Sequence, residues 1–259
     1  MNKFCSYTEF IHPKLRNTGW NGYWIDAAST LRMKDNATII LDPINKNIID
    51  DAINMGKKDF IGGNCTVSLM LMAIGGLIKA GHVKWISSMT YQAASGAGAN
   101  NMRELLNQMG HIHESVIKEI NDPSYSILDI DRKVSSSIRS SAMPTSQFGA
   151  PLAGSLLPWI DRLVEDGQTR EEWKGQAETN KILGSDPLIP IDGICVRIGA
   201  MRSHSQALTI KLNEDIPIKE IEQIILTDNE WVDIIENNKD CSLDKLTPAA
   251  ISGTLRISI

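Results

Sequence analysis

The order of hydrophobic and polar positions predicts alternating strands and helices through the first half of the chain. Short apolar or alternating runs bounded by turn residues are typical of strands, and they lie at residues 22–29, 37–43, 58–64 and 82–95. Longer segments with helical spacing or a terminal glycine predict helices at residues 47–56, 65–81 and 97–122. This alternation indicates an α/β beginning.

The second half is less regular. Residues 143–161 are rich in proline and glycine, which favours loops and short turns. Thr169, with Glu172 three residues later, forms the pattern of a capping box and predicts a helix over 169–183. The remaining segments predict two paired strands within 192–212, a helix at 217–226 and a final strand within 247–259. Together these elements indicate an α+β remainder.

Composition narrows the class of protein. The 259 residues carry a net charge of −5 and no basic stripe with interleaved aromatic residues, so nucleic acid is not an expected partner. Four cysteines fit neither a CxxC pair nor a zinc pattern, which favours reduced thiols, no metal site and a cytoplasmic location. The longest apolar stretch, Leu69–Ile78, is too short to span a bilayer, so no membrane association is expected.

Cys65 is the first candidate for chemistry. It follows Gly62, Gly63 and Asn64 at the expected start of a helix, and asparagine is a favoured N-cap residue. Unpaired N–H groups at a helix start would lower the thiol pKa and could stabilise an oxyanion. A packed, unreactive thiol is the alternative, because cysteine is among the most buried residue types. The local pattern alone favours this alternative.

A reactive thiol needs a group that moves protons, usually histidine. His204 is the best of the five histidines, because it stands at the end of an alternating segment among small polar residues. His12 precedes a proline in an expected loop, and the others are expected at the surface. Arg197 and Arg202 are close to His204 in sequence and could bind a carboxylate or phosphate, or could lie solvated at a strand edge.

Four long strings carry a resemblance to a known family: FIGGNCTVSLMLM, YQAASGAGANNMRELLNQMG, REEWKGQAETNKIL and GICVRIGAMRSHSQA. They resemble aspartate-semialdehyde dehydrogenase of the bacterial type, which reduces aspartyl phosphate with NADPH. The resemblance extends through nearly the whole chain, and it reverses the preference at Cys65 in favour of the nucleophile.

The resemblance implies a role for each matching position. Cys65 would attack the acyl phosphate, expel phosphate and hold a thioester, with His204 as the acid/base residue and Gln92 orienting the intermediate. Arg197 would bind the α-carboxylate of the substrate and Glu171 its amino group. The phosphate-binding set would be Arg32, Asn64 and Lys174, and the residues beside NADP would be Gln92, Ser95 and Gly96. A spacing of three residues places Glu171 and Lys174 on one helix face, where an exposed ion pair is the alternative interpretation.

One departure from the family concerns the cofactor. The family begins with a glycine-rich loop that holds the cofactor pyrophosphate and ends with a further helix, and this sequence contains neither. We therefore expect residues 1–63 to be a partial NAD(P)-binding domain, the remnant of a Rossmann-like fold. Residues 64–259 are then an α+β catalytic and dimerisation domain with a mixed sheet. Weak NADP binding, poor turnover and a homodimer follow as expectations.

Three functions remain open at this point. The first is NADP-dependent reduction of L-aspartyl 4-phosphate to L-aspartate 4-semialdehyde, in the pathway to lysine, threonine, methionine and isoleucine. The second is a catalytically inactive dimerisation partner with the same fold, which binding of NADP would distinguish from an enzyme. The third is a cofactor-independent cysteine hydrolase using Cys65 and His204, which the set Gln92, Glu171, Arg197 and Lys174 disfavours.

Overall fold

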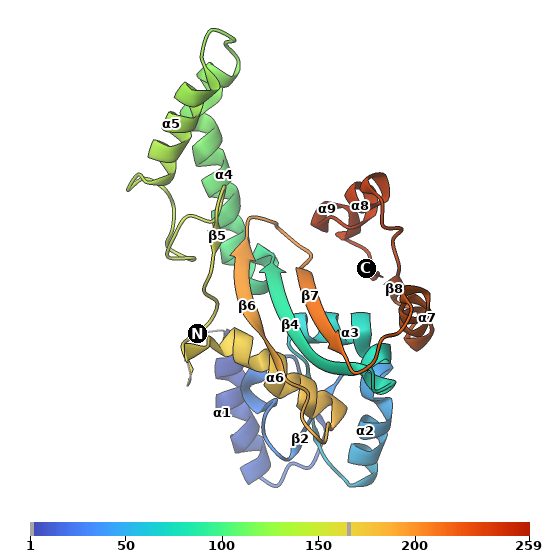
Figure 1. The fold of residues 1–259 in the computed structure, drawn as a ribbon. Helices are drawn as coiled ribbons and strands as arrows, with labels where there is room; N and C mark the ends of the chain where they lie inside the picture. The colour runs from blue at the N-terminus through green and yellow to red at the C-terminus, as the bar shows by residue number, and fades with distance from the viewer. Residues whose placement is uncertain (1–2, 165–166) are drawn as a thin grey trace.

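The computed structural model describes residues 3–164 and 167–259 (Figure 1). Two main sheets follow one another along the chain, and helix α6 contacts strands of both. The strands are β1 (Trp24–Asp26), β2 (Ala37–Ile40), β3 (Asp59–Gly62), β4 (Val83–Gln92), β5 (Leu156–Leu157), β6 (Ile191–Ile198), β7 (Ser205–Leu212), β8 (Val232–Asp233) and β9 (Ile257–Ser258). The helices are α1 (Lys3–Asn17), α2 (Asp42–Asn54), α3 (Cys65–Lys79), α4 (Ala99–Ile120), α5 (Ile127–Ile138), α6 (Arg170–Leu183), α7 (Ile218–Asp228), α8 (Lys239–Lys245) and α9 (Pro248–Ile251), with 3-10 turns η1 (Ser29–Leu31) and η2 (Ala94–Ala97).

The first sheet is parallel, with strand order β1-β3-β2. The sequence predicted these three strands but not helix α1, which packs near them. His12 was expected in a loop and instead lies buried in α1, with Nε2 2.9 Å from Oδ1 of Asp59. Arg16 Nη2 lies 2.6 Å from the same carboxylate oxygen, so an ion pair connects α1 to the start of β3.

The second sheet is mixed, as expected, with strand order β5-β6-β4-β7. Strand β4 is parallel to β6 and antiparallel to β7. The prediction that the two strands within 192–212 pair with each other is wrong, because β4 lies between them. The connection between β6 and β7 therefore crosses the end of β4, and this crossing carries His204.

One face of the mixed sheet changes from apolar to polar along its length. Strand residues that share this face lie in rows across β6, β4 and β7. The apolar row is Ile191, Ile86 and Ile210, which packs against α3 and α7 in the hydrophobic core. Further along the same face, the rows become Cys195, Thr90 and Gln206, and then Arg197 and Gln92. Because every second side chain of a strand points to the same face, this face carries polar side chains at one end of the sheet.

Helices α4 and α5 form an arm that projects away from the sheets (Figure 1). The sequence predicted α4 but not α5. The expected loop region after α5 contains only β5 as regular structure, and buried side chains of α4 hold it in place. Glu104 accepts hydrogen bonds from the backbone of Gln147 and Phe148, and Gln108 from Leu152 and Ala153.

The last residues differ from the expectation of one strand within 247–259. Thr247 caps the short helix α9, and Pro248 occupies its first turn. Only Ile257–Ser258 is a strand, and it pairs in parallel with β8. In the described part of the chain, no helix is long and apolar enough to cross a membrane.

Candidate active site

Cys65 is the first residue of α3, directly after the turn that ends β3. Asn64 caps the helix as predicted: its Oδ1 accepts hydrogen bonds from the backbone N–H groups of Thr66 at 3.0 Å and Val67 at 3.1 Å. Asn64 is buried, whereas Cys65 as a whole residue is exposed. The capped start of the helix therefore places Cys65 at the protein surface on an ordered backbone.

The charge environment of Cys65 differs from the expectation of a lowered pKa. Burial of the sulfur and the nearby carboxylate of Glu171 raise the thiol pKa. The backbone N–H of Thr66 and the charges of Arg197 and Lys174 act in the opposite direction but are outweighed. Without a ligand, Cys65 is therefore mainly a protonated thiol at neutral pH.

The register of the mixed sheet brings Gln92, Arg197 and His204 to the same rim. Gln92 on β4 is the direct neighbour of Arg197 on β6, and Ser205 on β7 is opposite Tyr91, so His204 follows at the rim. These residues come from distant parts of the sequence, and only the insertion of β4 between β6 and β7 unites them.

Ala93 links Arg197 to His204 through its backbone. Arg197 Nη1 donates to the carbonyl oxygen of Ala93 at 2.8 Å, and the Ala93 N–H donates to His204 Nδ1 at 3.0 Å. A ring nitrogen that accepts a hydrogen bond carries no proton, so the neutral imidazole bears its proton on Nε2. Burial and the charge of Arg197 lower the pKa of His204, with Glu171 opposing them, so the ring is neutral at pH 7.

Gly96 adjoins the reactive end of this pair. A Cβ atom at position 96 would lie 3.0 Å from both Arg197 Nη1 and His204 Nε2, which is closer than ordinary van der Waals contact. The absence of a side chain therefore lets the imidazole and the guanidinium pack closely against the backbone of residue 96.

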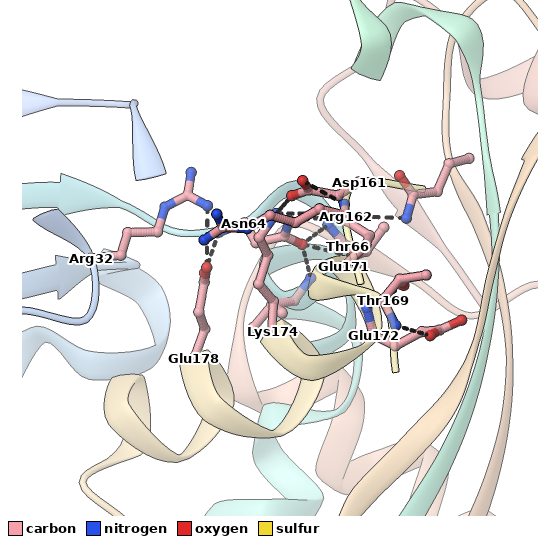
Figure 2. A network of polar contacts seen from close by, with 12 residues as sticks. Arg32, Asn64, Thr66, Asp161, Arg162, Thr169, Glu171, Glu172, Lys174 and Glu178 are labelled. Carbon is pink, nitrogen blue, oxygen red and sulfur yellow. Dashed lines mark hydrogen bonds and ion pairs between the residues drawn. The ribbon is translucent and has the colours of Figure 1, made fainter. Parts of the chain in front are cut away.

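A buried ion pair lies on the other side of the site (Figure 2). Glu171 accepts hydrogen bonds from Asn64 Nδ2 at 3.0 Å and Gln92 Nε2 at 3.2 Å, and Lys174 Nζ lies 2.8 Å from its Oε2. The side chains of Glu171 and Lys174 are 7% and 9% exposed, so the alternative of an exposed helical pair is wrong. Burial alone would raise the pKa of Glu171, but Lys174 and the amide donors outweigh it and lower the pKa.

Arg32 joins the same network from the first part of the chain (Figure 2). Its Nη1 lies 3.2 Å from Oε1 of Glu178, and its Nε donates to the carbonyl oxygen of Gly62 at 2.7 Å. Oε2 of Glu178 accepts the backbone N–H of Asn64 at 2.8 Å. One buried carboxylate on α6 therefore holds both Arg32 and the residue before Cys65.

Comparison with known proteins gives the family. A model of the semialdehyde dehydrogenase dimerisation domain matches residues 74–259. A structure of aspartate semialdehyde dehydrogenase from Francisella tularensis shares 50% sequence identity with this chain, with a TM-score of 0.92. The alignment covers 98% of this chain and 68% of that protein. The chain belongs to the aspartate-semialdehyde dehydrogenase family.

Other members of the aspartate-semialdehyde dehydrogenase family share the fold at low identity. A Vibrio cholerae enzyme II structure, described as complexed with ASA, is 22% identical with a TM-score of 0.70. A Candida albicans enzyme structure with NADP is 14% identical with a TM-score of 0.55. These alignments include 88% and 93% of this chain, but only 59% and 62% of the Vibrio and Candida proteins, respectively. Family membership supports an oxidoreductase, and the matched dimerisation domain supports a homodimer.

Every predicted site residue of this family member lies in or beside one region. Arg32, Asn64, Glu171 and Lys174 belong to the polar network of Figure 2. Gln92 joins this network to the sheet rim through Glu171, and Arg197 and His204 lie at that rim. Cys65 lies near Glu171, Lys174 and Arg197, whose charges act on its thiol. Ser95 and Gly96 lie in η2 at the same rim, and the Ser95 N–H donates to the carbonyl oxygen of Met201 at 3.0 Å. No group of three or more metal-ligating side chains occurs among residues 3–164 and 167–259.

The sequence did not reveal three residues of the site. Glu178 follows Glu171 and Lys174 on one face of α6, so the spacing of three and seven residues was a usable signal. Asp161, which lies 3.3 Å from Lys174 Nζ, has no such signal because it belongs to a loop. Cys195 lies on the inner face of β6, where burial raises its pKa to about 11, so it is a protonated thiol at neutral pH.

Proposed function

We propose that the chain catalyses the NADP-dependent reduction of L-aspartyl 4-phosphate to L-aspartate 4-semialdehyde, and the reverse phosphorylating oxidation, through a thioester on Cys65. The aspartate pathway to lysine, threonine, methionine and isoleucine, with diaminopimelate as an intermediate product, would use this reaction. The observation that carries the proposal is the convergence of Cys65 at a helix start, a neutral histidine and a buried ion pair beside one sheet rim. We further propose that the chain acts in the cytoplasm as a homodimer and binds neither nucleic acid nor membranes.

The ion pair and Arg197 suit an amino-acid substrate. A guanidinium binds a carboxylate in two-point fashion, so Arg197 would bind the α-carboxylate. Glu171 keeps its negative charge because its pKa is lowered despite burial, so it would accept the α-ammonium group. Gln92 donates to Glu171 at 3.2 Å, which fixes the amide between this subsite and the sheet rim.

The phosphate would bind to Arg32, Asn64 and Lys174. Arg32 and Asn64 are connected through Glu178, and Lys174 lies against Glu171 on the next turns of α6. Three hydrogen bonds occupy Arg32 inside the protein, yet each of its Nη atoms retains a second N–H for an anion. Cations and amide donors are the groups that a phosphate dianion requires.

Cys65 and His204 would carry out the acyl chemistry. Cys65 reacts as the thiolate, after its proton has passed to solvent: the sulfur forms a bond to the acyl carbon, the bond from that carbon to the phosphate oxygen breaks, phosphate leaves with the bonding electron pair, and a thioester remains. Because His204 Nδ1 is occupied by Ala93, its Nε2–H is the group that donates to the carbonyl oxygen as negative charge develops there. When the reduced carbon returns to a carbonyl, the carbon–sulfur bond breaks and the aldehyde departs.

NADP would bind beside Gln92, Ser95 and Gly96. Gly96 packs against His204 and Arg197 so closely that a Cβ would crowd both side chains, so a cofactor beside Gly96 would also lie next to these two residues. When bound, the cofactor supplies hydride to the thioester carbon.

The test is phosphate-dependent formation of NADPH from aspartate semialdehyde by the purified chain, with Cys65→Ala as the control. Activity that disappears in the variant supports the reaction. The second measurement is alkylation of Cys65, with and without aspartate semialdehyde. Protection by the substrate supports an intact acyl site even where turnover is slow. The proposal is refuted if the chain shows no activity and the substrate does not protect Cys65.

A catalytically inactive dimerisation partner is the second candidate. The raised thiol pKa of Cys65 favours it. Titration with NADPH, followed by its fluorescence, separates the two functions. A chain that forms dimers but binds no NADPH cannot perform the redox step and is a partner only.

A further inference from the structure

Asp161 occupies an unusual position beside the proposed phosphate subsite (Figure 2). Its φ angle is 69°, in the left-handed region that residues other than glycine rarely adopt. Trp159 Nε1 donates to its carbonyl oxygen at 2.8 Å, and the Arg162 N–H donates to its Oδ1 at 2.9 Å. These contacts orient the other carboxylate oxygen, Oδ2, toward Lys174 Nζ at 3.3 Å.

Lys174 therefore has two carboxylates beside its single ammonium group. Burial would lower the pKa of Lys174, but Glu171 and Asp161 outweigh it and raise the pKa. Glu171 is tightly held, because it is buried on the same helix and also accepts hydrogen bonds from Asn64 and Gln92. The cluster of one cation and two anions leaves no positive charge for a third anion.

The two carboxylates differ in how easily an incoming anion could replace them. The side chain of Asp161 is 35% exposed, whereas those of Lys174 and Glu171 are 9% and 7% exposed. Asp161 thus covers Lys174 from the solvent side. Its contact is also the longer one, at 3.3 Å against 2.8 Å for Glu171. A phosphate that approaches Lys174 meets Asp161 first.

We propose that Asp161 is the resident counter-ion of Lys174, that phosphate displaces it on binding, and that this competition sets the affinity of the phosphate subsite. The inference rests on the proposed role of Lys174 in binding phosphate. It assigns Asp161 the function of admitting only an anion with enough charge to replace a carboxylate. A phosphate dianion meets that requirement better than a singly charged carboxylate.

The test uses inorganic phosphate as the probe and Cys65 alkylation as the readout. The intact chain is treated with iodoacetamide at constant ionic strength, and the modified Cys65 peptide is quantified by mass spectrometry as phosphate is increased. Asp161→Asn removes the charge, and asparagine tolerates the left-handed backbone. We expect the phosphate concentration for half-protection to fall by roughly three- to tenfold, as for a partly exposed charge pair. Asp161→Gly, which also tolerates this backbone, is the second variant and should shift in the same direction.

Asp129→Asn is the matched control. Asp129 is an exposed carboxylate paired with Arg132 on the projecting arm, so its substitution changes the net charge equally but leaves the site alone. Half-protection should be unchanged in this variant. A gain in affinity at position 161 is diagnostic, because a merely structural defect would weaken binding.

Lys174→Met separates the inference from the function on which it rests. If phosphate protects the parent chain, and Lys174→Met weakens protection while its circular dichroism spectrum and urea midpoint show that it is still folded, the phosphate subsite is supported. Asp161 variants with unchanged or weaker protection then overturn the counter-ion role alone. If phosphate gives no protection, or Lys174→Met leaves protection unchanged, the proposed phosphate role of Lys174 fails, and the role of Asp161 fails with it.

Discussion

The buried pair of Glu171 and Lys174 predicts a large and measurable coupling energy. The two side chains are 7% and 9% exposed and their charged atoms are 2.8 Å apart, so water screens them little. Removing one partner of a buried pair typically costs about 3–5 kcal/mol, because the other charge is left uncompensated. We expect the lower end, about 3 kcal/mol, for Glu171→Gln, since Asp161 still lies 3.3 Å from Lys174.

Lys174→Gln should cost slightly more, roughly 4 kcal/mol, because Glu171 then keeps only neutral amide donors, Asn64 at 3.0 Å and Gln92 at 3.2 Å. The double variant leaves no unpaired charge at these two positions. Its loss should therefore be smaller than the sum of the single losses by about 2 kcal/mol.

Urea unfolding of the parent chain and the three variants, followed by far-ultraviolet circular dichroism, measures this cycle. Equal slopes across the four chains would show that the unfolded states are comparable. A coupling energy below about 0.5 kcal/mol, the range of exposed pairs, would refute the reasoning.

The pH dependence gives an independent check on the same pair. Burial opposes ionisation of Glu171, but Lys174 and the amide donors lower its pKa below the ordinary value. A lowered pKa stabilises the fold above the unfolded pKa of about 4.3, and this contribution is lost as pH falls through the folded value. The stability difference between the parent chain and Glu171→Gln should therefore be constant at neutral pH and shrink in acid.

Three further predictions concern the thiol and its surroundings. The alkylation rate of Cys65 should rise with pH to an inflection above the usual value of about 8.5, and Glu171→Gln should move that inflection down. Gly96→Ala should displace His204 by a few tenths of an ångström, since the new Cβ would lie 3.0 Å from Nε2, and reduce NADPH formation by about tenfold without unfolding the chain, as circular dichroism would verify. Asn64→Ala removes the cap of α3 and should lower the free energy of unfolding in urea by about 2 kcal/mol, whereas a loss under roughly 0.5 kcal/mol would show that the cap is dispensable.

Local signals in the sequence predicted the local structure around the site well. Asn64 and Thr169 both cap helices, and the Glu172 side chain completes the predicted capping box. Such contacts join residues two or three positions apart, so their pattern is visible without a fold. Helix α1 was missed because Pro13 within it is a signal for a break.

Long-range arrangement was the part that the sequence could not provide. The two strands that contain Arg197 and Gln206 are close in sequence, and an antiparallel hairpin is the ordinary expectation for such neighbours. In the structure Thr90 lies between Cys195 and Gln206, because β4 enters the sheet from a distant part of the chain. The resemblance named the candidate site residues, but only the strand order explains how Gln92, Arg197 and His204 share one rim.

The first 63 residues support the site in two ways: they contribute to the hydrophobic core beneath it, and they supply Arg32. The two main sheets separate near residue 63, whereas the hydrophobic core crosses that position: Ile39 of β2 packs with Val67 of α3 and Ile182 of α6 in one buried cluster. Asn45 adds a hydrogen bond from its Nδ2 to the carbonyl oxygen of Ile182 at 3.1 Å.

This shared core positions the face of α6 that carries Glu171, Lys174 and Glu178. Without the first segment, the cluster around Ile182 would lose Ile39 and Ile44, and Glu178 would lose its cationic partner Arg32, which lies 3.2 Å away. A buried carboxylate without a cation is costly, and this one also holds the Asn64 N–H at 2.8 Å, directly before Cys65. The thiol therefore depends for its orientation on residues that lie outside the matched dimerisation domain, which begins at residue 74.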